Sequence, residues 1–308
     1  MTGRRATGFS PRSALFVPGH RTDMLAKAAR SGPDAVIVDW EDAVPAAGKE
    51  EARASSLGAL ATQRPDVSTV LVRINAVGTP WFDADLAAAA SAMAGTGPGS
   101  GSGAGTGPGS GSGAGLDGVV LPKYEHPDQL SAVRSALPAG AVVVVGIESV
   151  LGVADARALL AEGPDAAYFG AEDYIADIGG RRTPGGTEVL YARSQVCLAA
   201  CLGGVSTLDQ VTAAVRDTDA FRADAEVGRS LGYTGKICLH PLQVAIAHEV
   251  FTPSPDEVAH AREVLRAAEG GVGVVNGQMV DAVHVTMARD VLARAGEKLP
   301  ATSHSTGG

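Results

Sequence analysis

The chain has 308 residues, of which 45% are hydrophobic, so it can bury a large core, and an α/β barrel reaches this length as one domain. Its formal net charge is -9 and its pI is near 5.3, with no block of basic residues. These values argue against a nucleic-acid partner or an anionic membrane surface, since both need a basic patch. We therefore expect a small-molecule ligand.

The N-terminal residues MTGRRATGFSPRS lack an apolar segment after their arginines, and no later run approaches the ~18 apolar residues of a membrane helix. The cysteines Cys197, Cys201 and Cys238 show no CxxC spacing and no framework of pairs. This usage is typical of reduced thiols that pack as small hydrophobes. We expect a cytoplasmic protein that does not bind a membrane.

Short apolar or β-branched runs alternate with Ala/Leu-rich stretches of helical periodicity along the chain. TDMLAKAAR, PDQLSAVRSAL and TDAFRADAEVGRSLG are examples of the helical stretches. The run GVSTLD is the weakest of the expected strands. The eight expected strands span residues 14–19, 35–42, 70–75, 118–123, 142–149, 166–173, 204–209 and 236–241.

Apolar strands that alternate with amphipathic helices predict a parallel sheet covered by helices, and eight such units predict a closed TIM (β/α)8 barrel over residues 1–252. An open doubly wound sheet is the alternative, weakened because no GxGxxG follows the first strand. Residues 96–115 repeat TGPGSGSGAG and predict a flexible, disordered surface loop. Residues 253–308 predict a C-terminal extension with two additional helices and a disordered tail.

Polar side chains recur where the expected strands end, which is where a parallel barrel gathers its catalytic groups. One of them, Glu148, follows the apolar run VVVVGI, and a carboxylate there needs a basic partner or a cation. Glu148 and Asp173 on adjacent strands can share one Mg²⁺, which leaves positions to water and substrate. Ion pairs with Arg73 and Lys123 are the alternative, and the strand-end argument does not choose between them.

Several segments then resemble one known family, in the right order along the chain. They include RSALFVPGHRTDMLAKAARSGPDAVIVDWEDAV, VRINAVGTPWFDADL, LDGVVLPK, GIESVLGV, FGAEDYIADIG, LGYTGKICLHPLQV and MVDAVHVTMARDVL. They resemble the HpcH/HpaI aldolase/citrate lyase family, which includes the citrate lyase β-subunit and malyl-CoA lyase. The resemblance runs from Arg12 to about residue 295, apart from the Gly/Ser repeat.

The resemblance implies a TIM barrel that cleaves, or forms, a carbon-carbon bond in a malyl-, citramalyl- or citryl-type thioester of CoA or an acyl carrier protein. It places Glu148 and Asp173 on the Mg²⁺ ligands of the family, which favours a metal over ion pairs. Arg73 matches the substrate-binding arginine. Asp281 matches an aspartate lent to a neighbouring subunit, which implies a homotrimer or hexamer.

These residue types suit the chemistry that the resemblance implies. Arg73 would stabilise the thioester enolate, and Asp281 would act as the base, with a helix N-cap as its alternative role. The cations Arg12, Arg21 and Lys27 are candidates for binding the phosphates of CoA. His240 is interpreted as a structural histidine ahead of a turn. The supporting residues around the site would be Asp39, Glu41, Asp42 and Lys123.

The chain departs from the family pattern at two places. Trp40 stands where many relatives have leucine, and ESVLG stands at 148–152 where relatives have ETARG or ESARG, so an arginine is absent. The second departure bears on acyl specificity. Three other readings stay open: hydrolysis of a malyl-CoA-type thioester, a citrate lyase β-like subunit that works only on a carrier protein, and aldolase chemistry on free 2-oxo acids.

Overall fold

The structure is a computed structural model that describes residues 8–95, 115–268 and 271–297. The chain divides into two compact units, residues 1–247 and 248–308, which are described separately. The expectations of a flexible repeat at 96–115 and a disordered C-terminal tail fall on residues outside the described ones, apart from Gly115 at the edge of the repeat.

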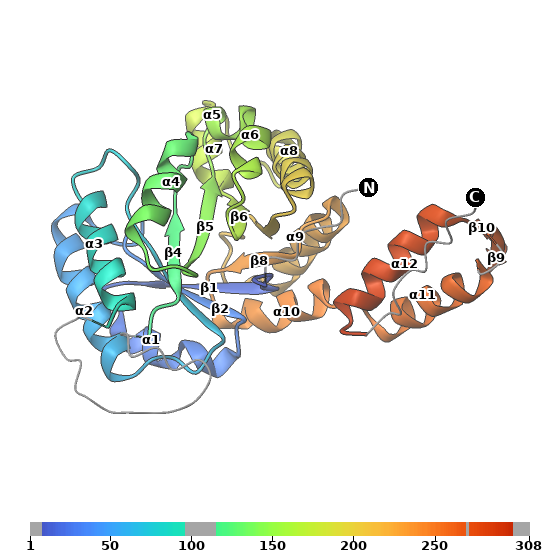
Figure 1. Cartoon of the computed structure of the whole chain (residues 1–308), viewed down its shortest axis with the longest axis horizontal. Coiled ribbons are helices and arrows are strands. Elements are labelled where there is room, and N and C mark those ends of the chain that lie inside the picture. The colour runs from blue at the N-terminus through green and yellow to red at the C-terminus, as the bar shows by residue number, and fades with distance from the viewer. Residues whose placement is uncertain (1–7, 96–114, 269–270, 298–308) are drawn as a thin grey trace. The chain divides into compact units, whose positions relative to one another are not determined.

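Eight parallel strands close into a barrel in chain order, with β1 paired to both β2 and β8 (Figure 1). The expected TIM barrel is confirmed, including its weakest strand. Apart from β7, the expected strands ran past the observed ends, because their last residues leave the hydrogen-bonded ladder and enter a loop or, after β6 and β8, the start of a helix. The strands are β1 Ser13–Pro18, β2 Ala35–Asp39, β3 Thr69–Arg73, β4 Gly118–Leu121, β5 Val142–Ile147, β6 Ala166–Phe169, β7 Ser206–Asp209 and β8 Gly235–Cys238.

Helices follow every strand and surround the barrel (Figure 1). In the first half these are α1 Thr22–Ala28, η1 Ala29–Ser31, η2 Ala46–Gly48, α2 Lys49–Thr62, α3 Phe82–Met93 and α4 Pro127–Ala136. In the second half they are α5 Val150–Ala154, α6 Ala156–Ala161, α7 Ala171–Asp177, α8 Thr187–Gly203, α9 Thr218–Leu231 and α10 Pro241–Phe251. No helix in the described ranges is long and apolar enough to cross a membrane.

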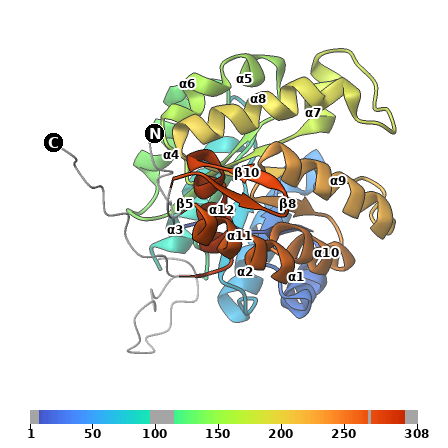
Figure 2. The same cartoon turned by 90° about the vertical axis from the view of Figure 1, so that its right-hand side faces the viewer.

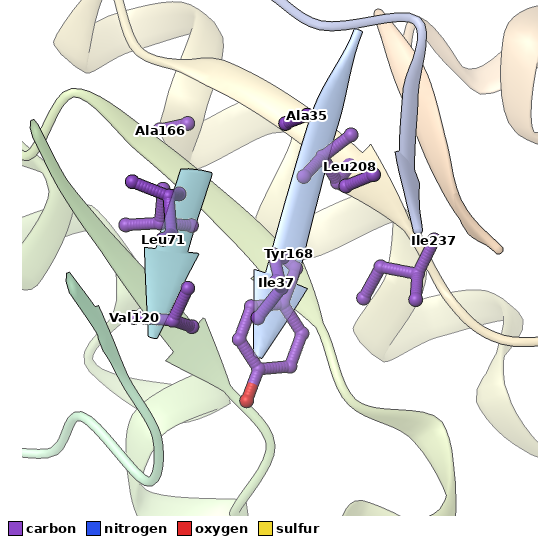
Figure 3. Close-up of a cluster of buried hydrophobic side chains, with 10 residues drawn as sticks. Ala35, Ile37, Leu71, Val120, Ala166, Tyr168, Leu208 and Ile237 are labelled. Carbon is purple, nitrogen blue, oxygen red and sulfur yellow. The ribbon is translucent and has the colours of Figure 1, made fainter. Parts of the chain in front are cut away.

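The barrel interior is a packed core of side chains, shown in Figure 3. Because side chains alternate between the two faces of a strand, every second residue points inward. The core residues Ile37, Leu71 and Ala166 are thus followed, two positions along their strands, by Asp39, Arg73 and Tyr168. The strands therefore carry polar groups into the barrel at their C-terminal ends.

The second unit has a small core of its own between two helices and a hairpin, drawn in red in Figure 2. It contains α11 Pro255–Ala267, β9 Gly273–Val275, β10 Gln278–Val280 and α12 Ala282–Arg294. The two expected helices are present. The hairpin was not expected, although its turn residues Asn276 and Gly277 both have positive φ, at 49° and 78°. Asn-Gly is the sequence pattern for such a turn, but strands of three residues leave too short an alternation to recognise.

A glycine at the contact between β4 and β5 gives a test of the strand packing. A Cβ at Gly118 on β4 would lie 1.9 Å from the carbonyl oxygen of Val142 on β5. We expect Gly118→Ala to lower the free energy of unfolding by about 1–3 kcal/mol, because the strands must separate. Gly58 on α2 has nothing within 4 Å of its Cβ position, so Gly58→Ala should raise stability by about 0.5–1 kcal/mol. Urea unfolding compares the two, and equal effects would contradict the strand packing.

Candidate active site

A cavity of about 390 Å³ opens where the C-terminal ends of the strands meet. Its lining includes five side chains that were named from the sequence as site residues: Asp39, Asp42, Arg73, Glu148 and Asp173. They come from β2, β3, β5 and the first turn of α7, or from the residues just after these strands. The structure therefore brings the main candidates together at one end of the barrel.

Glu148 points into the barrel because it continues the inward series of β5 two residues after Gly146. Its side chain is almost completely buried, and its Oε1 accepts a hydrogen bond of 2.7 Å from the backbone N–H of Lys123. Burial raises the pKa of the Glu148 carboxyl, and the charge of nearby Asp173 adds to the rise while Arg73 opposes it. A Cβ at Gly170 would lie 2.3 Å from Glu148 Oε2, so the glycine leaves room for this carboxylate.

Lys123 links the acidic groups of the mouth. Its Nζ lies 2.8 Å from Glu41 Oε1 and 3.2 Å from Asp173 Oδ1, while its N–H is bonded to Glu148. Its φ is 49°, in the left-handed region that costs a non-glycine residue about 1 kcal/mol or more. The ion-pair alternative is thus found for Asp173, whereas Glu148 is bound by the amide of Lys123 and not by its ammonium group.

Arg73 is held rigidly by carboxylates from the end of β2. Its Nε and Nη2 donate to the two oxygens of Asp39, at 2.8 and 2.6 Å, in a bidentate pair. Asp39 in turn accepts from the backbone N–H groups of Glu41 and Ala43. The guanidinium lies 4.9 Å from the ring centre of Phe16. Both the position and the plane of the guanidinium are therefore fixed before any ligand binds.

Glu41 is buried beside the two cations. Its Oε2 lies 3.1 Å from Arg73 Nη1 but makes no hydrogen bond to a described residue. Burial raises the pKa of Glu41 to about 7, with Arg73 opposing and Glu148 adding to the rise. The expected supporting residues thus all take part: Asp39 and Asp42 contact Arg73, and Glu41 contacts both Arg73 and Lys123.

Tyr168 is a site residue that the sequence reasoning missed. It lines the cavity from β6, and its buried hydroxyl lies next to the Glu148 carboxylate. Burial raises its pKa well above the usual value, as does the nearby Glu148 carboxylate, so the hydroxyl keeps its proton. Gly146 makes room for it, since a Cβ there would lie 2.4 Å from the hydroxyl oxygen. The alternation of β6, which places Tyr168 inward two residues after Ala166, is the feature of the sequence that could have identified it (Figure 3).

The expected phosphate-binding cations are not all at the mouth. Arg12 precedes β1 and is therefore at the opposite end of the strands, where it forms a bidentate pair with Asp34 at 2.9 Å for both bonds. Its assignment to the mouth was wrong for this reason. Arg21 lies in the loop after β1, on the mouth side, and is paired with Asp23. Lys27 is exposed on α1 with its Nζ 3.7 Å from the same carboxylate.

Asp281 lies in the second unit, where it is the N-cap of α12. Its Oδ1 accepts from the backbone N–H groups of Val283 and His284 and contacts His284 Nδ1 at 2.8 Å. The N-cap role is thus observed, and it leaves the catalytic role of Asp281 a prediction. His240 has a comparable local role, since its Nδ1 accepts from the N–H of Leu242 at the start of α10.

The donor set at the mouth fits a hard divalent cation with an open coordination sphere. In the described part of the chain, no group of three or more His, Cys, Asp or Glu side chains is placed so that it could hold a metal ion. Two carboxylates, Glu148 and Asp173, face the same cavity. Mg²⁺ is commonly bound through one or two carboxylates and keeps several positions for water and substrate, so this pair matches its preference.

Comparison with known proteins identifies the family. The model of the HpcH/HpaI aldolase/citrate lyase family matches residues 12–96 and 110–241. The chain belongs to this family. The match covers the whole barrel from the residue before β1 to the start of α10, so it includes every strand-end residue discussed above.

Individual relatives cover nearly the whole chain. A citrate lyase subunit beta-like protein of Deinococcus radiodurans is 43% identical over 298 residues, covering 92% of this chain and 96% of the relative. A (3S)-malyl-CoA thioesterase of Cereibacter sphaeroides is 32% identical, covering 92% and 94%. The structure of CitE from Mycobacterium tuberculosis with magnesium, acetoacetate and coenzyme A matches with a TM-score of 0.75 and 32% identity, covering 94% and 100%.

The Arg73–Asp39 pair predicts a large cost when one partner is removed. We expect Asp39→Ala to lower the free energy of unfolding by about 3 kcal/mol, because it leaves a buried guanidinium without its bidentate acceptor. Asp23→Ala is the control, since it removes an exposed carboxylate from Arg21 and should leave the urea midpoint unchanged. A midpoint for Asp39→Ala equal to that of the control would show that Arg73 does not depend on Asp39.

Proposed function

We propose that the barrel mouth binds Mg²⁺ and a β-hydroxy acyl thioester of coenzyme A, and cleaves the carbon-carbon bond between the hydroxyl-bearing carbon and the thioester fragment. The products are a 2-oxo acid and an acyl thioester such as acetyl-CoA, and the same site can run the reverse condensation. The observation that carries the proposal is the buried Glu148 carboxylate, which faces one cavity together with Asp173 and the fixed guanidinium of Arg73.

Glu148 and Asp173 are the residues that would hold the cation. Magnesium is present in the related M. tuberculosis CitE complex, which supports this ion for the present chain. When bound, the cation polarises the oxygens of the substrate and stabilises negative charge. The N–H of Lys123 fixes one oxygen of Glu148, so the other remains directed to the cavity side, next to Gly170.

Arg73 and Tyr168 would bind the reacting part of the substrate. The Asp39 pair occupies Nε and Nη2 of Arg73, and Nη1 lies 3.1 Å from Glu41 and 3.4 Å from Asp42, so a substrate oxygen would bind Nη1 beside these two carboxylates. Charge that develops on the thioester oxygen during cleavage would be stabilised by this fixed group at no cost of reorganisation. The hydroxyl of Tyr168 is a neutral donor in the same cavity, beside Glu148, and it could donate to a substrate oxygen bound there.

Three further assignments stay with the family resemblance. Asp281 of a neighbouring copy is our candidate for the base that removes the hydroxyl proton, in a homotrimer or a hexamer built from trimers. Arg21 and Lys27 remain candidates for the phosphates of CoA, or of the carrier arm if the thioester belongs to an acyl carrier protein. Apart from the resemblance, we also propose that the protein works in the cytoplasm, as its cysteine usage indicates.

Thioester hydrolysis is the second candidate reaction, and it is favoured by the 32% identical malyl-CoA thioesterase. The two reactions differ in which bond breaks. Hydrolysis breaks the carbon-sulfur bond and releases free CoA thiol with an intact hydroxy diacid. Cleavage by a lyase releases a 2-oxo acid and leaves the thioester bond in the product.

The decisive assay mixes the purified protein with Mg²⁺ and malyl-, citramalyl- or citryl-CoA and measures 2-oxo acid and free thiol separately. We expect 2-oxo acid release that stops on addition of EDTA and returns with excess Mg²⁺. Free thiol without 2-oxo acid would select the thioesterase. Neither product, from any of the three substrates, would contradict both reactions and favour a subunit that depends on a carrier protein.

The metal site gives a prediction that does not depend on turnover. We expect Mg²⁺ to raise the thermal midpoint of the unaltered protein and to leave that of Glu148→Ala unchanged, because the buried ligand is lost. The same variant should lose roughly 1,000-fold in turnover, since metal polarisation supplies several kcal/mol of the barrier. Glu226→Ala, which removes an exposed carboxylate on α9, is the control and should keep both the shift and the activity. A Mg²⁺ shift retained in Glu148→Ala would place the cation elsewhere.

Tyr168→Phe separates a role in the reaction from a role in the fold. The hydroxyl's neighbour in the protein is the Glu148 carboxylate, so its removal should lower the free energy of unfolding by no more than about 1 kcal/mol. We expect kcat to fall by about 100-fold, as when one donor to developing charge is removed, with the Mg²⁺ shift retained. Unchanged kcat would show that the hydroxyl does not touch the substrate.

A further inference from the structure

The lining of the cavity is divided between two arcs of the barrel. The arc from β2 to β6 supplies its polar and charged groups, among them Asp39, Arg73 and Glu148. The other arc consists of β7, β8 and β1, which are consecutive in the closed barrel. The lining side chains from this arc are all apolar: Phe16, Pro18, Val211, Ile237 and Leu239.

Cations near the apolar arc are already engaged elsewhere. Lys236 on β8 is completely buried, one residue before inward-facing Ile237, and its Nζ is bonded to Asp209 and Asp224. Arg182, which follows α7, does not line the cavity and is paired with Glu172 and Glu188. Among the described lining residues the single cation is Arg73, which already contacts three carboxylates.

The separation of the cavity into a polar and an apolar arc bears on the identity of one substituent of the substrate. In the cleavage proposed above, the hydroxyl-bearing carbon carries a carboxylate, the bond that breaks and a third substituent. The hydroxyl gives up its proton and becomes the carbonyl of the 2-oxo acid. The electron pair of the broken bond stays on the thioester fragment, which takes up a proton. The third substituent passes unchanged into the 2-oxo acid: hydrogen gives glyoxylate, methyl gives pyruvate and carboxymethyl gives oxaloacetate.

We infer that this third substituent is a short alkyl group, which contacts the apolar arc formed by Phe16, Val211, Ile237 and Leu239. The inference rests on the proposed lyase function. With the substrate carboxylate and hydroxyl held by the polar arc, the third substituent is directed to the opposite arc. A second carboxylate there would be buried against apolar side chains, in a cavity whose lining already holds five carboxylates. The one guanidinium in the lining, Arg73, lies 4.9 Å from the Phe16 ring and is already shared by three carboxylates.

The expected preference follows from these contacts. One additional methyl group in a hydrophobic pocket changes kcat/KM by about 10-fold or more, so citramalyl-CoA should be cleaved about 10-fold better than malyl-CoA. An uncompensated carboxylate is penalised more strongly than a missing methyl group, and citryl-CoA should be at least roughly 100-fold poorer than citramalyl-CoA.

A binding measurement tests the cavity independently of turnover. With Mg²⁺ present, the unaltered protein is titrated with glyoxylate, pyruvate, 2-oxobutyrate and oxaloacetate, and the rise in thermal midpoint is followed for each. We expect pyruvate and 2-oxobutyrate to bind at least 10-fold more tightly than oxaloacetate. Val211→Arg should reverse this order by placing a cation in the apolar arc, while Val227→Arg, on the exposed surface of α9, should leave it unchanged.

The outcomes separate this inference from the proposed function. Cleavage of citryl-CoA in preference to citramalyl-CoA would overturn the inference and leave the lyase standing. Tighter binding of the alkyl 2-oxo acids without any cleavage would support the inference about the cavity and contradict the lyase. Oxaloacetate bound as tightly as pyruvate, or no 2-oxo acid bound at all, would overturn the inference. If Val211→Arg does not fold, the order of binding to the unaltered protein still decides.

Discussion

The negative charge of Glu148 is the feature around which the barrel mouth is organised. Burying an ionised carboxylate is costly unless hydrogen bonds and opposite charges compensate it. Here the protein supplies one backbone N–H, from Lys123, the positive charge of nearby Arg73, and one glycine, Gly170, that makes space. Holding that N–H in place requires a left-handed backbone at Lys123, so the neighbouring structure bears strain to serve this carboxylate. Strain of this kind is typical of functional sites.

A comparison of two buried charge clusters within the barrel unit supports a cation at the mouth. Between the barrel and its outer helices, Arg193 and Lys236 are paired with Asp209 and Asp224, so positive and negative groups are equal in number. At the mouth, two cations contact five carboxylates, and a third cation, Lys49, lies behind them with its Nζ bonded to the carbonyls of Trp40 and Glu41. The two contacting cations are Arg73 and Lys123, and the carboxylates are Asp39, Glu41, Asp42, Glu148 and Asp173. The first cluster is complete as a structural unit, whereas the second has a surplus of negative charge that a divalent ion would compensate.

Much of the architecture could be predicted from the sequence because the barrel strands are short, apolar and separated by amphipathic helices. The position of a residue relative to its strand also predicted its end of the barrel, and Asp39, Arg73 and Glu148 follow that rule. The same rule correctly places Arg12 at the opposite end of the barrel, away from the cavity, because Arg12 precedes β1. Its charge and its place beside the first expected strand make Arg12 a candidate in the sequence, whereas its pairing with Asp34 depends on a contact between residues 22 positions apart.

Other features could not be predicted from local patterns. The β9–β10 hairpin is too short for its alternation to be recognised, although Asn276 and Gly277 marked the turn. Lys123 was identified as polar and near the site, but its role through the backbone N–H depends on a φ angle that the sequence does not specify. Tyr168 looks like one more large residue in an apolar strand. Only the closed barrel shows that its hydroxyl reaches the cavity lined by the charged strand-end residues, where Gly146 on the neighbouring strand makes room for it.

The apolar arc of β7, β8 and β1 has the same physical origin as the polar arc. Each barrel strand alternates inward and outward residues, and the last inward residue before the loop decides the chemistry of its part of the mouth. On β2 and β3 this last inward residue is charged, and on β5 the next inward residue, just after the strand, is charged. On β8 the last inward residue is the apolar Ile237, and the next one is Leu239. Substitution at these few positions would change the substrate substituent that fits, while the proposed metal ligands on the opposite arc stay in place. Specificity and metal binding can therefore vary independently on one barrel, which is why membership of the family does not by itself name the substrate.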